Sequence, residues 1–128
     1  MIAVDTSALM AVLRKEELGQ ACEAALKTDQ PILMSAATVA ECLIVTSRKR
    51  TLPGMKILLD LLEIRVIDVT SEVAQAAADA YTLWGKGFHE AGLNYGDCFS
   101  YVAARTHDCP LLYVGDDFAR TDVVSALA

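Results

Sequence analysis

The chain has 128 residues, a net charge of −6 and 54% hydrophobic residues, which suits one globular domain and excludes a disordered or fibrous chain. Its four cysteines form no C-x-x-C pair and complete no zinc spacing with the two histidines, so we expect neither a zinc site nor a disulfide framework. The apolar runs are too short to span a bilayer and no secretory signal is visible, which predicts a cytoplasmic protein without a membrane partner.

Hydrophobic periodicity and capping residues predict strands that alternate with helices along the chain. The predicted strands cover residues 1–4, 32–34, 65–69 and 111–114. The predicted helices cover residues 8–14, 17–26, 36–50, 55–63, 71–84, 97–107 and 121–127, and a loop with four glycines covers 85–96. This alternation predicts an α/β fold with helices on both faces of a central parallel sheet of four to five strands.

Acidic residues follow several of these elements at corresponding points. Asp5 and Asp116 each come directly after a predicted strand, so both carboxylates are expected at the edge of the sheet where ligands bind. Asp97 follows a glycine and is expected to open a helix. Taken singly, Asp5 and Asp97 are also explained as helix N-caps, and Asp116 as a turn residue.

Glu41 is the most informative acid, because its helix neighbours Ala37, Ile44 and Val45 are apolar. A glutamate on such a face costs free energy unless a charged or hydrogen-bonding group meets it, and a salt bridge to Arg or Lys is one alternative. Two carboxylates about 4 Å apart repel by about 4 kcal/mol at an effective dielectric constant of about 20, so clustered acids call for a cation. Carboxylate oxygens suit Mg²⁺ or Mn²⁺, and such an ion can activate a water for attack on a phosphodiester.

The motifs resemble, in order and over essentially the whole chain, those of the PIN-domain family and of one subgroup of VapC-type toxins. They are Val4-Asp5-Thr6-Ser7-Ala8, Ala40-Glu41, the region from Gly85-Lys86-Gly87 through Gly96-Asp97-Cys98 to Ala103-Ala104, and Leu111 to Phe118. The resemblance implies one PIN domain over residues 1–128, folded as a three-layer α/β/α sandwich. It further implies a metal-dependent endoribonuclease toxin that uses Mg²⁺ or Mn²⁺, forms a homodimer and is inhibited by a VapB-type antitoxin.

The resemblance also assigns roles to particular residues. Asp5, Glu41 and Asp97 carry over as the catalytic acids that hold the metal, with Asp116 favoured as the fourth acid and Asp117 as its alternative. The residues expected to support these acids or a water at the metal are Thr6, Ser7 and Asp122. The candidates for RNA contact are Lys86, His89, Arg48 and Arg50, for which a solvated basic face is an equally good interpretation of the cations.

Three other functions are alternatives to this hypothesis. A haloacid-dehalogenase-like phosphatase needs a second Asp two residues after the first, where Ser7 stands, and a receiver domain needs an acid pair that the N-terminus lacks. A non-catalytic PIN-like module that binds RNA or an antitoxin is the serious alternative. Because every acidic position is filled, the sequence favours the enzyme, while the RNA target stays open.

Overall fold

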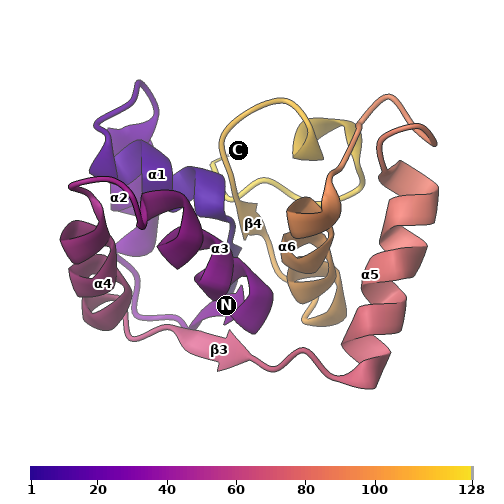
Figure 1. Cartoon of the computed structure of the whole chain (residues 1–128), viewed down its shortest axis with the longest axis horizontal. Helices are drawn as coiled ribbons and strands as arrows, with labels where there is room; N and C mark the ends of the chain where they lie inside the picture. The colour runs from indigo at the N-terminus through magenta and orange to yellow at the C-terminus, as the bar shows by residue number, and fades with distance from the viewer. Residues whose placement is uncertain (128) are drawn as a thin grey trace.

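The computed structural model describes residues 1–127, in which a four-stranded parallel sheet lies between two groups of helices (Figure 1). The strands are β1 (Ile2–Val4), β2 (Ile32–Ser35), β3 (Arg65–Ile67) and β4 (Leu111–Leu112), and they lie in the order β3-β2-β1-β4. The helices are α1 (Thr6–Leu13), α2 (Gly19–Leu26), α3 (Ala36–Thr46), α4 (Leu52–Leu61), α5 (Ser71–Trp84) and α6 (Tyr95–Thr106). The predicted α/β fold with a parallel sheet of four to five strands is confirmed.

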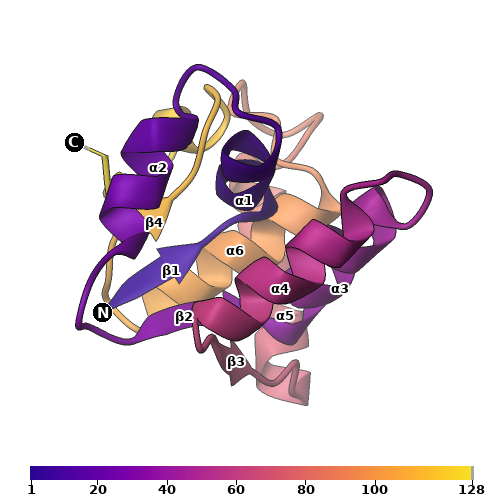
Figure 2. The ribbon, with the colours of Figure 1, turned by 90° about the vertical axis from the view of Figure 1, so that its left-hand side faces the viewer.

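Two hydrophobic cores cover the two faces of the sheet, because neighbouring residues of a strand point to opposite sides. Ala3 of β1 packs in the core formed with α5 and α6, whereas Ile2 and Val4 pack in the core formed with α1, α2 and α4. Figure 1 shows α5 and α6 together on one side of the molecule and α1, α2 and α4 on the other. Figure 2 shows β1 running directly into α1, so the carboxyl end of the first strand is followed at once by the start of a helix.

Capping residues account for several helix boundaries that differ from the predicted ones. Pro53 lies in the first turn of α4, where its missing N–H costs nothing, so it begins this helix in addition to separating it from α3. Asn94, and not Asp97, is the N-cap of α6. The longest helix, α5, has 14 residues, and no helix among residues 1–127 has the length and apolar character needed to cross a bilayer.

The predicted helix over residues 121–127 is wrong. A short 3₁₀-helix, η1 (Phe118–Arg120), is followed by an extended segment that pairs in parallel with β4 at Leu111 and Ser125. The Leu111 N–H donates to the Val124 carbonyl at 2.9 Å, and the Ala126 N–H donates to the Leu111 carbonyl at 2.9 Å. Pairing with the edge of the sheet therefore outweighs the local helical pattern of this segment.

Candidate active site

The site lies where the strand order of the sheet reverses direction. From β1 the chain adds β2 and then β3 on one side, whereas β4 lies on the other side of β1. Ligands of open parallel sheets bind at this switch point, beyond the carboxyl ends of the strands. Asp5 directly follows β1, and Asp116 and Asp117 lie in the turn that follows β4, so the sheet brings both acidic segments to the same edge.

Asp5 is held from two sides before any ligand binds. Its Oδ2 accepts hydrogen bonds from the backbone N–H of Ser7 at 3.0 Å and from the Ser7 hydroxyl at 2.7 Å, and its Oδ1 accepts from the Ser100 hydroxyl at 2.5 Å. The Ser7 hydroxyl in turn accepts from the Val114 N–H at 3.0 Å, which ties α1 to the segment after β4. Asp5 is only 4% exposed, and these donors compensate the burial of its charge.

Glu41 reaches the site from α3 and lies against the backbone at the start of α6. The Thr6 hydroxyl donates to its Oε1 at 2.6 Å. A Cβ atom added to Gly96 would lie 2.5 Å from Glu41 Oε2, so the carboxylate packs directly against the α6 backbone and would have to move if position 96 carried a side chain. No Lys or Arg among residues 1–127 forms an ion pair with Glu41, so the salt bridge considered as an alternative does not form there.

Asp97 is the third residue of α6 and completes a capping box with Asn94. The Asn94 N–H donates to Asp97 Oδ2 at 3.0 Å, and the Asp97 N–H donates to Asn94 Oδ1 at 2.8 Å. Burial raises the pKa of Asp97, the Asn94 N–H lowers it, and the negative charges of Asp5, Asp117 and Glu41 raise it again. Together these effects bring the pKa to about 6. The negative charges of three acids from three other segments therefore act on the Asp97 carboxyl.

Of the two candidates for the fourth acid, Asp116 and its alternative Asp117, it is Asp117 whose charge acts on Asp97. Its charge raises the pKa of Asp97, and Asp116 is not among the groups that act on that carboxyl. Both residues are exposed, and they follow Gly115, whose φ of 109° turns the chain through a conformation that glycine adopts readily. The direction of this turn decides which of the two acids faces the site.

The four acids offer a divalent cation carboxylate oxygens, but not a ready set of three direct ligands in the described chain. Among residues 1–127, no group of three or more His, Cys, Asp or Glu side chains is arranged to hold a metal ion directly. None of the four acids forms an ion pair with Lys or Arg in the same part of the chain, so their charge has no cationic partner there. Mg²⁺ needs only one or two carboxylates because it keeps several waters, which suits this donor set.

Asp122 lies in a different network from the four acids. It accepts a hydrogen bond from the Tyr101 hydroxyl at 2.7 Å and lies 3.6 Å from the Arg105 guanidinium. The same Tyr101 oxygen accepts a hydrogen bond from the indole of Trp84 at 3.0 Å. These contacts join α5 and α6 to the C-terminal segment through Asp122.

The residues expected to contact RNA are spread over two loops. Arg48 and Arg50 are exposed in the turn between α3 and α4, and Lys86 is exposed in the loop after α5. His89 is half-buried: its Nδ1 accepts from the Ala91 N–H at 2.9 Å and its ring lies 4.8 Å from that of Trp84. The structure therefore places Arg48 and Arg50 in one loop, and Lys86 and His89 in another.

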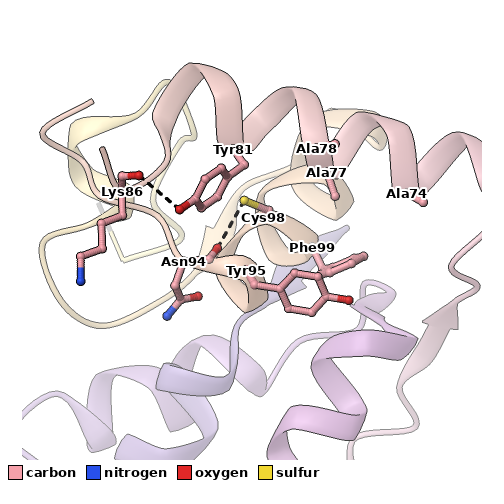
Figure 3. A pocket seen from close by; sticks show the side chains of 9 residues that line it. All are labelled: Ala74, Ala77, Ala78, Tyr81, Lys86, Asn94, Tyr95, Cys98 and Phe99. Atoms are coloured by element: carbon pink, nitrogen blue, oxygen red, sulfur yellow. Dashed lines mark hydrogen bonds between the residues drawn. The ribbon is translucent and has the colours of Figure 1, made fainter. Parts of the chain in front are cut away.

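An apolar groove of about 540 Å³ lies between α5 and α6, next to the acids but separate from them. Figure 3 shows three alanines of α5 facing the rings of Tyr95 and Phe99, with Lys86 and Asn94 at one end. No acidic residue of the described chain lines the groove, and Asn94 links it to the site by capping Asp97. The groove is therefore a feature separate from the group of acids.

Sequence reasoning missed Asn94, Ser100 and Thr38 as residues of the site. A signal for the first two was present, because Asn94 precedes Asp97 by three residues, the spacing of a capping box, and Ser100 follows it by three, one helical turn away. Thr38 precedes Glu41 by the same interval on α3. That Thr38 and Ser100 face each other depends on how α3 and α6 pack, which sequence spacing does not reveal.

Comparison with known proteins gives full-length matches. The PIN domain family matches residues 2–124. Ribonuclease VapC30 of Mycobacterium tuberculosis is 40% identical over 127 residues, which cover 97% of each chain. Ribonuclease VapC28 of the same species is 43% identical over 129 residues (97% of this chain and 96% of that one), and ribonuclease VapC of Mycolicibacterium smegmatis is 39% identical over 127 residues (97% and 98%).

Two solved structures share the fold. VapC20 of M. tuberculosis, described as a Sarcin-Ricin loop cleaving toxin, superposes with a TM-score of 0.78 at 18% identity, covering 97% of each chain. VapBC2 of Rickettsia felis, bound to a DNA fragment from its promoter, gives a TM-score of 0.69 at 18% identity, covering 98% of this chain and 96% of that one. At this identity the two structures support the fold alone.

Proposed function

The chain belongs to the PIN-domain family, with VapC ribonucleases among its relatives, and from this premise we propose that it is an endoribonuclease toxin dependent on Mg²⁺ or Mn²⁺. The predicted resemblance to this family and the predicted PIN-like fold are confirmed. The metal dependence and the roles of single residues are our proposal. They rest on the geometry of the four acids and on the chemistry that such a group permits.

One observation carries the proposal: the charges of Asp5, Glu41 and Asp117 act on Asp97 at the switch point of the sheet, and none of the four acids has a cationic partner in the described residues. We assign Asp5, Glu41 and Asp97 to holding the ion, directly or through its waters. Asp117 adds negative charge at the open side of the site. Thr6 and Ser7 orient Glu41 and Asp5 through the hydrogen bonds described above.

The catalytic work divides between the ion and the chain. Bound Mg²⁺ or Mn²⁺ supplies positive charge that offsets the charge of the phosphodiester and makes a water a better nucleophile. The chain fixes the carboxylates in place, so little reorganisation is needed when substrate binds. Asp97 holds a cation best when its carboxyl is ionised. Because its pKa is about 6, the site gains its full negative charge only near neutral pH.

The proposed partners are an RNA substrate, a VapB-type antitoxin and a second copy of the chain, all met in the cytoplasm. The VapBC2 complex with a similar fold supports the antitoxin. Large apolar side chains are exposed on α3 and α4 and around the groove between α5 and α6, among them Ile44, Ile57, Leu61, Phe88 and Tyr95. Exposed apolar patches of this kind are typical of surfaces that partners cover.

Cleavage of a defined RNA panel by antitoxin-free protein tests the proposal. The panel contains transfer RNAs, ribosomal RNA loops and messenger RNA, each incubated with Mn²⁺, with Mg²⁺ or with EDTA. We expect cleavage by wild type with either metal, and none with EDTA or with Asp5→Asn, which also controls for a contaminating ribonuclease. RNA that wild type binds but leaves intact in every lane would contradict the proposal and favour the non-catalytic binding module.

A further inference from the structure

Two buried hydroxyls lie directly beneath the acids. Thr38 and Ser100 are each 1% exposed, and their hydroxyl oxygens are 3.3 Å apart although 62 residues separate them in sequence. Thr38 lies one turn before Glu41 on α3, and Ser100 lies one turn after Asp97 on α6. Residues at this spacing share a helix face, so the hydroxyl contact joins the same two faces that present the acids.

The direction of these hydrogen bonds follows from counting protons. Ser100 donates its single hydroxyl proton to Asp5 Oδ1 at 2.5 Å, because a carboxylate can only accept. The Ser100 oxygen is then the acceptor in its contact with Thr38, and the Thr38 hydroxyl is the donor. The two hydrogen bonds therefore run in one direction, from Thr38 to Ser100 and from Ser100 to Asp5, and each bond polarises the next.

Asp5 has little accepting capacity left once these bonds are counted. A carboxylate offers about four acceptor positions on its two oxygens. The Ser7 N–H and hydroxyl both bond to Oδ2, and the Ser100 hydroxyl bonds to Oδ1. About one position remains, and it is on Oδ1. The same atom that Ser100 holds is therefore the atom through which Asp5 can bind an ion or one of its waters.

We propose that Thr38 and Ser100 are positioning residues that orient Oδ1 of Asp5 toward the metal and set the affinity of the site for it. The inference rests on the proposed metal-dependent function and adds two residues to it. Ser100 holds the carboxylate, and Thr38 holds Ser100 in the rotamer that reaches it. Partners that orient metal ligands in this way typically change metal affinity by about 10- to 100-fold when removed.

Thr46 provides a matched control for Thr38. It lies on α3 as well, is fully buried, and donates its hydroxyl to the Cys42 carbonyl of its own helix at 2.8 Å. Thr38→Val and Thr46→Val therefore each remove one buried hydroxyl from the same helix at nearly constant volume. Thr38→Ser keeps the hydroxyl and removes only the methyl group.

The experiment measures Mn²⁺ binding to the full chain by calorimetry, with RNA cleavage as a second readout. We expect Thr38→Val to raise the Kd for Mn²⁺ by about tenfold, Thr46→Val to leave it within twofold of wild type, and Thr38→Ser to recover most of the loss. Ser100→Ala should have a larger effect on the Kd than Thr38→Val. If the Thr38→Val protein does not fold, Ser100→Ala takes its place in the experiment. Cleavage should fall in parallel at low Mn²⁺ and recover partly at high Mn²⁺.

Equal Mn²⁺ affinity of Thr38→Val and Thr46→Val, with wild type binding normally, would overturn the positioning role and leave the proposed function intact. Failure of Thr38→Ser to recover affinity would also overturn it, because packing rather than the hydroxyl would then be responsible. Failure of wild type itself to bind Mn²⁺ would instead overturn the proposed metal-dependent function.

Discussion

Asp5 and Asp117 reach the same site in contrasting ways. Asp5 is buried after the first strand, and both of its carboxylate oxygens accept hydrogen bonds from Ser7 and Ser100. Asp117 is exposed in the turn that follows β4, and its side chain caps neither the 3₁₀-helix that follows nor any other helix of the described chain. One acid is held by the fold, whereas the other is carried by a turn on the surface.

The difference teaches how the free energy of the site is distributed. Folding orients Asp5, because the same hydrogen-bond donors that hold its carboxylate also offset the cost of burying its charge. Ligand binding therefore has no further free-energy cost for orienting this acid. Asp117 keeps its hydration, and a turn with few buried contacts can adjust at low cost. A buried acid that is oriented beforehand and an exposed acid that can move should respond differently to substitution.

The largest expected effect comes from neutralising the acids one at a time. We expect Asp5→Asn to lower kcat/KM for RNA by more than about 100-fold, because it removes a fixed charge from the centre of the site. Asp117→Asn should cost about tenfold, since its charge acts from the solvent side. Asp116→Asn is the matched control and should stay within about twofold, measured on one RNA at fixed Mn²⁺. A greater loss from Asp116→Asn than from Asp117→Asn would restore Asp116 as the fourth acid, as the sequence favours.

The second prediction concerns pH and Asp97. Its pKa rises from 3.8 in the unfolded chain to about 6 in the folded one, so between these values the folded state holds a proton that the unfolded chain has released. The stability of the metal-free protein that this group contributes should therefore fall as the pH rises from about 4 to about 6. Asp97→Asn keeps an acceptor for the Asn94 N–H and should stabilise the metal-free protein at pH 7 by on the order of 1 kcal/mol, after allowance for solvent screening.

Thermal unfolding in EDTA between pH 4.5 and pH 7.5 checks this second prediction. Asp79→Asn, which changes an exposed acid on α5, is the control and should follow wild type across the range. Added Mg²⁺ should raise the Tm of wild type at pH 7 and raise that of Asp97→Asn less. A difference in Tm between Asp97→Asn and wild type that is the same at pH 5 and pH 7 would refute the raised pKa.

The smallest expected effect comes from filling the space beside Glu41. A glycine in a helix is usually less stable than alanine by about 0.5–1 kcal/mol, so Gly→Ala generally stabilises. Gly54→Ala should do so, because its Cβ would lie 3.4 Å from a methyl group of Leu13, which can shift. Gly96→Ala places its Cβ 2.5 Å from Glu41 Oε2 and should displace that carboxylate, lowering activity by about threefold without loss of fold. Unchanged activity together with a higher Tm for Gly96→Ala would show that activity does not depend on the present position of the Glu41 carboxylate.

The fold was largely predictable because its signals are local. Ser35 caps α3 as the sequence indicated, its hydroxyl accepting from the Ala37 N–H at 3.2 Å, and the buried strands read as short apolar runs. The helix expected over residues 121–127 failed for the opposite reason. The backbone partner of that segment is Leu111, and a pattern of neighbouring residues contains no information about a strand edge elsewhere in the chain.

The candidate site was predictable only in part. Strand ends and motif order brought Asp5, Glu41 and Asp97 together on sequence grounds. The choice between Asp116 and Asp117 was not available, because it depends on the direction in which the turn at Gly115 sends the chain. The hydroxyls of Thr38 and Ser100 escaped notice for a similar reason, since their 3.3 Å contact exists only once α3 and α6 have packed.

The backbone pairing of residues 124–126 with Leu111 also bears on aggregation. An uncovered edge strand offers its free N–H and C=O groups as a template for strands of other molecules. The C-terminal segment occupies those groups on β4, while the opposite edge, β3, is only three residues long and carries an exposed Arg65. Residues 124–126 thus protect this edge of the sheet from pairing with strands of other molecules, and we expect their removal to lower the solubility of the protein before it lowers its activity.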